Sequence, residues 1–166
     1  MQIETFQGTI REIIIRPLDA ESFAPYGEVI EAPAQSGRSY FNNLGNLRKS
    51  AQPKLWLLTK MPTPQFPIKV DCLERHEFSS QTFVPTDVGR WAVIVAPTAS
   101  SGGPASHQAE AFLANQRQGV SYRPNVWHGA LNVFDKVARF TVFMWLDGTP
   151  ADEEIVSIPP FVVREV

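Results

Sequence analysis

The chain has little that would tie it to a membrane, an oxidising compartment or a nucleic acid. Its 166 residues contain one cysteine, Cys72, so no intramolecular disulfide can form and secretion gains no support. Residues 1–5 are polar and acidic, unlike a signal peptide, and the longest apolar run, residues 91–97, is too short to span a bilayer. The net charge is −2, and the lysines and arginines are scattered. We expect a cytoplasmic globular protein with no nucleic-acid or membrane partner.

Common catalytic motifs are also missing. The sequence has no Gly-x-Ser-x-Gly elbow, Walker motif, dinucleotide fingerprint or Cys-x-x-Cys pair, which excludes the enzyme classes that depend on them. A nucleophilic role for Cys72 would require a histidine beside it in the fold. Free cysteines are among the most buried residues, so we expect Cys72 to be a small buried side chain.

The chain does have many turn residues. Fourteen prolines and ten glycines divide it into short segments, which is typical of many short strands, and its length fits one domain over residues 1–166. A short helix is expected at residues 19–24, with Asp19 as its N-cap and Leu18 and Phe23 as a hydrophobic staple. Alternation and flanking turn residues predict strands at 28–31, 55–59, 68–73, 80–84, 90–96, 109–114, 120–122, 131–134 and 138–146. An antiparallel double-sheet barrel limits the exposed edges of so many strands.

The predicted strand 138–146 is apolar on both of its faces. An antiparallel sheet normally keeps one face in contact with water, so the second face of this strand needs a cover. A second copy of the chain is the simplest cover, and an N-terminal segment is the alternative. We expect a homodimer.

Two segments with strand composition carry polar side chains where a core strand would carry Val, Ile or Thr. The first, residues 74–85, contains Glu74, His76 and Gln81, and the second ends at His128. Either histidine alone is more typical of a hydrogen-bonded core residue. Inside one barrel, the two histidines with a carboxylate and an amide could bind a metal or move protons.

A cupin-like motif surrounds the second histidine. The spacing Pro124-x-x-x-His128-x-x-x-Asn132 is similar to the second motif of the cupin superfamily, in which a proline precedes the histidine and an asparagine follows it by four residues. The first cupin motif, His-x-His followed by Glu, has His76 and Gln81 as its nearest equivalents. This resemblance implies an all-β, cupin-like antiparallel double-sheet barrel with one or two short helices.

Other candidate residues have an ordinary structural explanation as well. Arg75 and Arg123 offer planar forks that suit a carboxylate, but single arginines are more typical of surface positions. Tyr122 and Trp127 are more typical of a barrel core than of a substrate platform. His107 follows a Gly/Pro-rich loop and is expected to face solvent.

Longer stretches of the chain resemble the ureidoglycolate lyase family, long called the ureidoglycolate hydrolase family. Residues 16–30 are similar to the family's Leu…Phe-x-x-[Tyr/Phe]-Gly-[Asp/Glu]-Val-Ile opening, and Asn42 and Asn43 match a paired-Asn element. The most specific matches are residues 73–85 and 118–128, and together the similar stretches span most of the chain. The matching site positions are Asn42, Asn43, Glu74, Arg75, His76, Gln81, Tyr122, Trp127 and His128.

The resemblance implies an activity and roles for these residues. It implies a homodimeric carbon–nitrogen lyase of the amidine-lyase type, which cleaves ureidoglycolate to glyoxylate and urea late in purine breakdown through allantoin. His76 or His128 would act as base with Glu74 orienting it, or His76, Gln81 and His128 would bind a divalent metal such as nickel. Substrate would be held by Arg75, Arg123, Asn42, Asn43, Tyr122 and Trp127.

Three departures from the family pattern leave a second function open. Arg123 follows Tyr122 where the family has Tyr-His, Gly129 follows His128 where it has a further His-Pro, and Met144 begins a pair that replaces Asp-Arg. These changes remove ionisable groups from the expected pocket. The alternatives are a cupin-like protein that binds a small carboxylate without turnover, or a related enzyme with another substrate.

Overall fold

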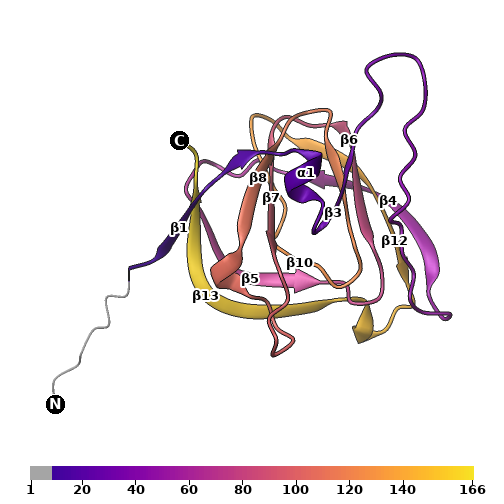
Figure 1. Ribbon diagram of the computed structural model, residues 1–166. Helices are drawn as coiled ribbons and strands as arrows, with labels where there is room; N and C mark the ends of the chain where they lie inside the picture. The colour runs from indigo at the N-terminus through magenta and orange to yellow at the C-terminus, as the bar shows by residue number, and fades with distance from the viewer. Residues whose placement is uncertain (1–8) are drawn as a thin grey trace.

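The computed structural model describes residues 9–166, and these residues form two β-sheets packed face to face as a barrel (Figure 1). The predicted domain 1–166 therefore starts before the described part, and the polar start at residues 1–5 lies outside it. The larger sheet contains, in spatial order, β1 (Arg11–Ile14), β13 (Glu154–Arg164), β5 (Ile68–Arg75), β10 (Trp127–His128), β7 (Trp91–Ala96), β8 (Glu110–Ala114) and β2 (Arg16–Pro17), and β11 (Asn132–Val133) also pairs with β7. The smaller sheet contains β3 (Gly27–Ile30), β9 (Gly119–Tyr122), β6 (Gln81–Asp87), β12 (Ala138–Leu146) and β4 (Gln52–Lys60).

The predicted all-β, antiparallel double-sheet barrel is confirmed. The described residues contain one α-helix, α1 (Ala20–Phe23), and two short 3₁₀ turns, η1 (Ser106–Gln108) and η2 (Pro150–Asp152). Each predicted strand is present, although most bounds differ by one to three residues. Pairing is antiparallel except at the β1–β13 and β2–β8 contacts, which are parallel.

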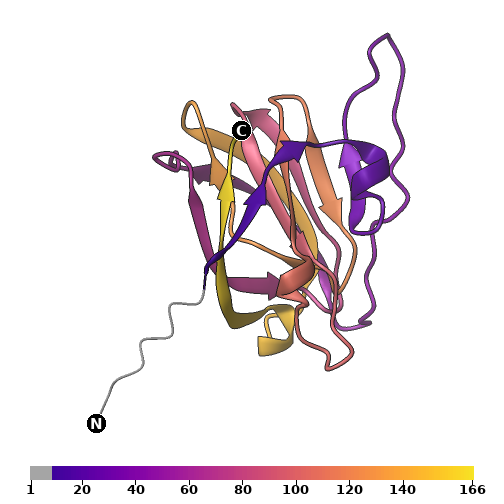
Figure 2. The same ribbon diagram turned by 60° about the vertical axis from the view of Figure 1, so that its left-hand side comes forward.

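Local details of the short helix also follow the sequence. Asp19 caps α1, since its Oδ1 accepts a hydrogen bond of 2.9 Å from the backbone N–H of Ser22. Leu18 and Phe23 are both buried in the same hydrophobic cluster, as the staple requires. Between β3 and β4, residues 31–51 form a long loop that projects beyond the barrel (Figure 2).

Two expectations about strands were incomplete or wrong. The strand β13 was not predicted, because Pro159 and Pro160 interrupt its pattern, and the ladder to β5 indeed shifts register between Ser157 and Phe161. The expected burial of Cys72 is wrong. Cys72 lies opposite Ser157 at the edge of this irregularity, and both side chains are exposed.

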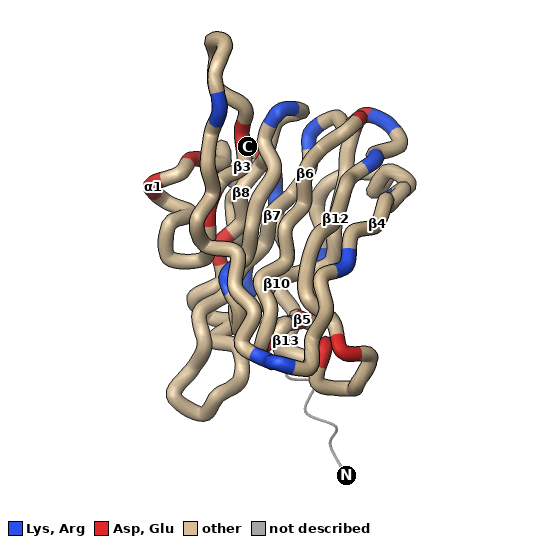
Figure 3. Tube along the Cα trace, turned by 90° about the vertical axis from the view of Figure 1, so that its right-hand side faces the viewer, with Lys and Arg blue, Asp and Glu red and all other residues tan. Residues whose placement is uncertain are grey.

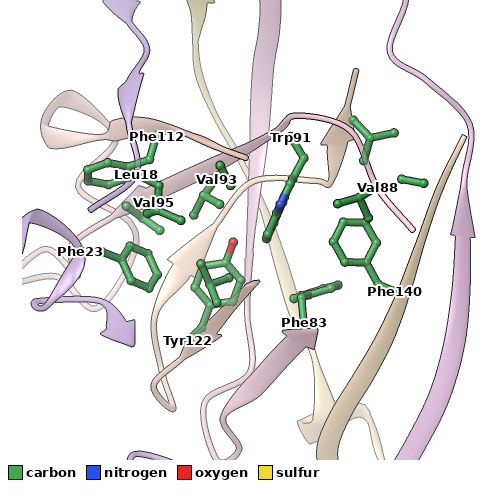
Figure 4. Packing of buried hydrophobic residues seen from close by; sticks show 14 of the residues in the cluster. Leu18, Phe23, Phe83, Val88, Trp91, Val93, Val95, Phe112, Tyr122 and Phe140 are labelled. Atoms are coloured by element: carbon green, nitrogen blue, oxygen red, sulfur yellow. The ribbon is translucent and has the colours of Figure 1, made fainter. Parts of the chain in front are cut away.

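The core between the sheets is strongly aromatic (Figure 4). Phe23 packs edge-on against Phe112 at 5.9 Å, and Phe140 packs edge-on against Trp91 at 5.1 Å. Strand β7 is buried along its whole length because a second cluster, from β5, β7, β8 and β13, covers its other face. Lysines, arginines and acidic residues are dispersed over the rest of the molecule (Figure 3). None of the helices in the described residues is long and apolar enough to cross a membrane.

Candidate active site

Glu74, His76 and His128 come together at one place in the barrel. Glu74 and His128 lie opposite each other in the β5–β10 ladder, and His76 follows directly after β5. One ligand atom from each of the three residues lies within 4.8 Å of the other two, and the two imidazole centroids are 5.4 Å apart. The structure thus brings the two predicted strand segments together, and we call these three residues the Glu-His-His cluster.

His128 is held on three sides. Its Nδ1 lies 3.0 Å from the carbonyl oxygen of Val126, which can only accept, so the proton lies on Nδ1 and Nε2 has a free lone pair. Its ring stacks on Tyr122 with centroids 4.3 Å apart and planes 12° from parallel. Its Nε2 lies 3.1 Å from Glu74 Oε1 without the alignment of a hydrogen bond.

His76 is fixed in the same way by a different segment. Its Nδ1 lies 2.8 Å from the carbonyl oxygen of Asp152, so this imidazole also keeps its proton on Nδ1 and leaves Nε2 free. Burial of the ring and the nearby His128 lower the pKa of His76, and the carbonyl of Asp152 only partly opposes them. His76 is therefore neutral near pH 7.

The two carboxyl groups beside the histidines have pKa values that are shifted in opposite directions. Burial works to raise the pKa of Glu74, but the neighbouring imidazoles of His128 and His76 outweigh burial and lower it. Glu153 lies beside Glu74, and burial together with the Glu74 charge raises the pKa of Glu153. Sequence reasoning missed Glu153, because the acidic run at residues 152–154 has the composition of an ordinary exposed turn.

Three polar atoms at this place are buried without a hydrogen-bond partner among the described residues. They are Nε2 of His76, Nε2 of His128 and Oε1 of Gln81, while the amide nitrogen of Gln81 lies 3.8 Å from Met144 Sδ. An unsatisfied buried polar atom costs about 1–3 kcal/mol, so a protein seldom keeps three together without a use for them. Two imidazole nitrogens, a carboxylate and an amide oxygen form a donor set that suits a divalent ion such as nickel or zinc. The Glu-His-His cluster could bind a metal, and Glu74 joins the predicted ligands His76, Gln81 and His128.

A small cavity of about 160 Å³ opens onto this cluster. Glu74 and His128 supply its charged and titratable lining, Tyr122 adds a buried ring, and Leu58, Phe83, Ala92, Gly129 and Leu131 complete the wall. The volume equals roughly five water molecules at about 30 Å³ each, which suits a small substrate. The lining contains no lysine or arginine from residues 9–166.

The two arginines predicted to bind substrate make other contacts. Arg75 donates to Glu154 at 2.7 Å and to Asn125 at 2.7 Å, and its guanidinium lies over the Trp127 ring at 4.6 Å. Arg123 donates from Nη1 to the carbonyl oxygen of Ala24 at 2.5 Å. The structure therefore does not bring either guanidinium to the wall of the cavity.

The remaining predicted positions are spread around the cluster. Trp127 points away from His128, as neighbours on a strand must, and it is buried in the second hydrophobic cluster. Asn42 and Asn43 lie in the long loop, where their backbone N–H groups face the carboxylate of Glu28 at 3.4 and 3.0 Å. His107 is exposed in η1, as expected.

Comparison with known proteins identifies relatives over most of the chain. The sequence pattern of the ureidoglycolate lyase family matches residues 10–163. A ureidoglycolate lyase of Rhizobium leguminosarum bv. trifolii (strain WSM2304) is 37% identical over 162 residues, which cover 91% of this chain and 95% of that protein. A ureidoglycolate lyase of Pseudomonas syringae pv. syringae (strain B728a) is 34% identical over 143 residues, covering 80% and 82%. Among solved structures, a dTDP sugar isomerase from Desulfovibrio desulfuricans G20 is similar with a TM-score of 0.49 at 14% identity, covering 78% of this chain and 81% of that one.

Proposed function

Because the chain belongs to the ureidoglycolate lyase family, we propose that it cleaves ureidoglycolate to glyoxylate and urea in the breakdown of purines through allantoin. The observation that carries the proposal is the Glu-His-His cluster, which lies within the matched residues 10–163 and contributes Glu74 and His128 to the wall of a cavity of small-molecule size. We also propose that the enzyme acts in the cytoplasm, where a chain with one cysteine is typical.

The reaction needs one proton to move. Ureidoglycolate carries a hydroxyl and a ureido nitrogen on the same carbon. When a base takes the hydroxyl proton, the oxygen forms a carbonyl with that carbon, the carbon–nitrogen bond breaks, and the departing nitrogen takes up a proton. Glyoxylate and urea together contain all the atoms of the substrate, so no water is consumed. A single base can therefore accept the proton and then return it.

We assign the base to His128. It lines the cavity, and its Nε2 has a free lone pair because Nδ1 donates to Val126. Glu74, 3.1 Å away, stabilises the imidazolium that forms, since its lowered pKa keeps it ionised. His76 does not line the cavity, and its lowered pKa makes it a weak base, so it does not compete for the proton.

We propose that Arg123, rather than Arg75, binds the substrate carboxylate. All three nitrogens of the Arg75 guanidinium contact Glu154, Asn125 or Gly102, so a substrate would have to displace them. The side chain of Arg123 makes one hydrogen bond within the described part of the chain, through Nη1, and keeps other donors for a bidentate contact.

As the alternative to a base at His128, whose Nε2 cannot accept a proton while it binds a metal, we propose that Glu74, His76, His128 and Gln81 hold a divalent metal, with nickel as the ion that the family resemblance implies. Such an ion would polarise the substrate hydroxyl and lower its pKa. The residues contribute free Nε2 lone pairs on two imidazoles, whose Nδ1–H groups are fixed by backbone carbonyls, an arrangement typical of metal-binding histidines.

A coupled assay for urea and glyoxylate tests the proposed function. Purified protein should release the two products in equal amounts from ureidoglycolate. Protein treated with EDTA should lose this activity if the metal takes part and regain it with nickel. Absence of turnover under both conditions, together with saturable binding of glyoxylate by calorimetry, would overturn the lyase proposal in favour of a carboxylate-binding protein.

We further propose a homodimer that buries the outer face of β4 and β12. Leu55 and Leu57 on this face are 69% and 80% exposed, and Phe143 lies opposite Leu55 in the ladder. Apolar surface of this kind typically marks an interface. Light scattering at micromolar concentration should report a dimer that Leu57→Lys dissociates, whereas Ile155→Lys on the other sheet, at an equally apolar exposed site, should leave it intact.

A further inference from the structure

The carbonyl group that orients His76 belongs to a segment held by partly buried charges. We propose that Arg48 and Asp152 are positioning residues, whose ion pair holds the turn at residues 147–152 so that the carbonyl of Asp152 keeps the His76 proton on Nδ1 and turns Nε2 toward Glu74 and His128. This inference rests on the proposed function of the Glu-His-His cluster.

The carboxylate of Asp152 organises the turn that contains its own carbonyl. Its Oδ1 accepts from Arg48 Nη2 at 2.5 Å and from the backbone N–H of Asp147 at 3.0 Å, and its Oδ2 accepts from the N–H of Gly148 at 2.7 Å. Asp152 donates its own N–H to the carbonyl of Thr149 at 3.0 Å. The backbone of Asp152 therefore has little freedom to move while these bonds persist.

Arg48 joins this turn to the segment that carries His76. Its Nη1 lies 3.0 Å from Asp147 Oδ1, and its guanidinium lies 5.3 Å from the centre of the Phe78 ring, two residues after His76. The neighbouring Leu47 donates its N–H to the carbonyl of Phe78 at 2.8 Å. One side chain thus contacts both the histidine's own segment and the turn that supplies its acceptor.

Burial sets this cluster apart from the other Arg and Lys ion pairs of residues 9–166. The side chains of Arg48 and Asp147 are 12% exposed and that of Asp152 is 16% exposed, whereas each other pair has at least one partner above 40%. Buried ion pairs contribute little net stability, because desolvation offsets their attraction, and fixing one geometry is a better-attested use for them. Because Asp152 also supplies the carbonyl that contacts His76, the geometry that these ion pairs fix is that of this carbonyl.

The consequence for His76 is a choice of tautomer. If the Asp152 carbonyl moves away, a neutral imidazole can place its proton on Nε2, which then no longer offers a lone pair to the cluster. Asp152→Asn should cause this change, because the amide has one acceptor oxygen where the carboxylate has two, and Gly148 or Asp147 would lose its partner. Arg48→Lys keeps the charge but loses the planar fork, so it should act in the same direction more weakly.

The test is to record nitrogen-15 NMR spectra of the imidazoles, with the His76 signals assigned by their loss in His76→Gln. The wild-type protein should show His76 as one neutral tautomer with its proton on Nδ1, and Asp152→Asn should show a second tautomer. The Kd for nickel chloride, measured by calorimetry, should rise about 10- to 100-fold, as when the partner of a metal-binding histidine is lost. The control is Asp135→Asn, which weakens the exposed Arg90–Asp135 pair and should change neither reading.

The outcomes separate this inference from the proposed function. An Asp152→Asn protein that folds, keeps the single Nδ1-protonated tautomer and binds nickel as the wild type does would overturn the positioning role. If Asp152→Asn does not fold, the same readings on Arg48→Lys decide it. A wild-type protein without turnover or nickel binding would defeat the proposed function, while the tautomer comparison would still decide whether Arg48 and Asp152 orient His76.

Discussion

Two parts of the barrel interior differ in whether their buried polar atoms have hydrogen-bond partners. In the aromatic part, Phe23, Trp91, Phe112 and Phe140 are fully buried against one another, and the Trp91 indole N–H donates to the carbonyl of Gln118 at 3.0 Å. In the Glu-His-His cluster, imidazole nitrogens are buried without a partner. The first arrangement contributes hydrophobic stabilisation, and the second reduces stability. The comparison indicates that the aromatic part holds the fold and the polar part is kept for chemistry.

Removing an aromatic side chain should have the largest effect on folding. We expect Phe112→Ala to lower the free energy of unfolding by about 3–5 kcal/mol, because it leaves a cavity among fully buried rings. Phe112 does not line the cavity at the cluster, so kcat per folded molecule should be unchanged. Urea denaturation and the product assay measure the two quantities.

The control is Ile155→Ala at a position that is 59% exposed, which should change stability by no more than about 0.5 kcal/mol. If Phe112→Ala instead reduces kcat while stability is retained, the division between the two parts does not hold.

Removing the proposed base should instead reduce activity strongly and stability less. We expect His128→Ala to lower kcat by at least ~100-fold, the low end of what a positioned acid–base group supplies. Its loss of stability should be smaller than that of Phe112→Ala, because Nε2 of His128 has no hydrogen bond to lose. The matched control is His107→Ala, since His107 is exposed and remote from the cavity. Equal rates for His128→Ala and wild type would remove the base from the mechanism.

A smaller effect is expected at Arg123, the residue proposed to bind the substrate carboxylate. Arg123→Ala should raise KM by about tenfold with kcat nearly unchanged, because a charge-assisted contact of about 1.5 kcal/mol would be lost from substrate and transition state alike. Arg75→Ala provides the comparison, and it should affect KM less because Arg75 is paired with Glu154. A larger increase in KM for Arg75→Ala than for Arg123→Ala would mean that Arg75, and not Arg123, binds the substrate carboxylate.

The sequence predicts the barrel well because strand formation depends on local patterns. Alternation and turn residues are enough to locate strands such as β12, whose predicted bounds 138–146 match the structure. The strand β13 was missed because two prolines break its pattern while a bulge accommodates them. Cys72 was misplaced because its exposure depends on that same irregularity, which only the partner strand reveals.

The candidate site was predictable only in part. His76, Gln81 and His128 stand out because polar side chains on strands need an explanation. The contact between Glu74 and His128 depends on the β5–β10 ladder, which no local pattern specifies. The contact of His76 with Asp152 is still harder to predict from the sequence, because it uses a backbone carbonyl that every residue type possesses. Similarly, nothing in the neighbourhood of Arg75 indicates that Glu154 will engage it.

The smallest expected effect is a dependence of stability on pH, and it can separate the two parts of the interior without substrate. Burial and His128 lower the pKa of His76 below its ordinary value of 6.5. Just below pH 6.5, His76 therefore binds a proton in the unfolded chain but not in the folded chain. The contribution of His76 to stability should therefore be constant above pH 6.5 and decline from there until the folded pKa is reached, whereas Glu153, whose pKa is raised by burial, acts in the opposite direction in wild type and variants alike. Glu74, Asp147 and Asp152 also have lowered pKa values, but they reduce stability only at and below about pH 4.5, where unfolded carboxylates begin to bind protons. Urea denaturation in EDTA between roughly pH 7.5 and roughly pH 5, a range that brackets the ordinary histidine pKa, should show a decline for wild type and for His107→Gln that His76→Gln removes. Parallel curves for all three proteins would mean that burial of His76 carries no cost, and the contrast between a satisfied aromatic part and an unsatisfied polar part would then lose its energetic basis.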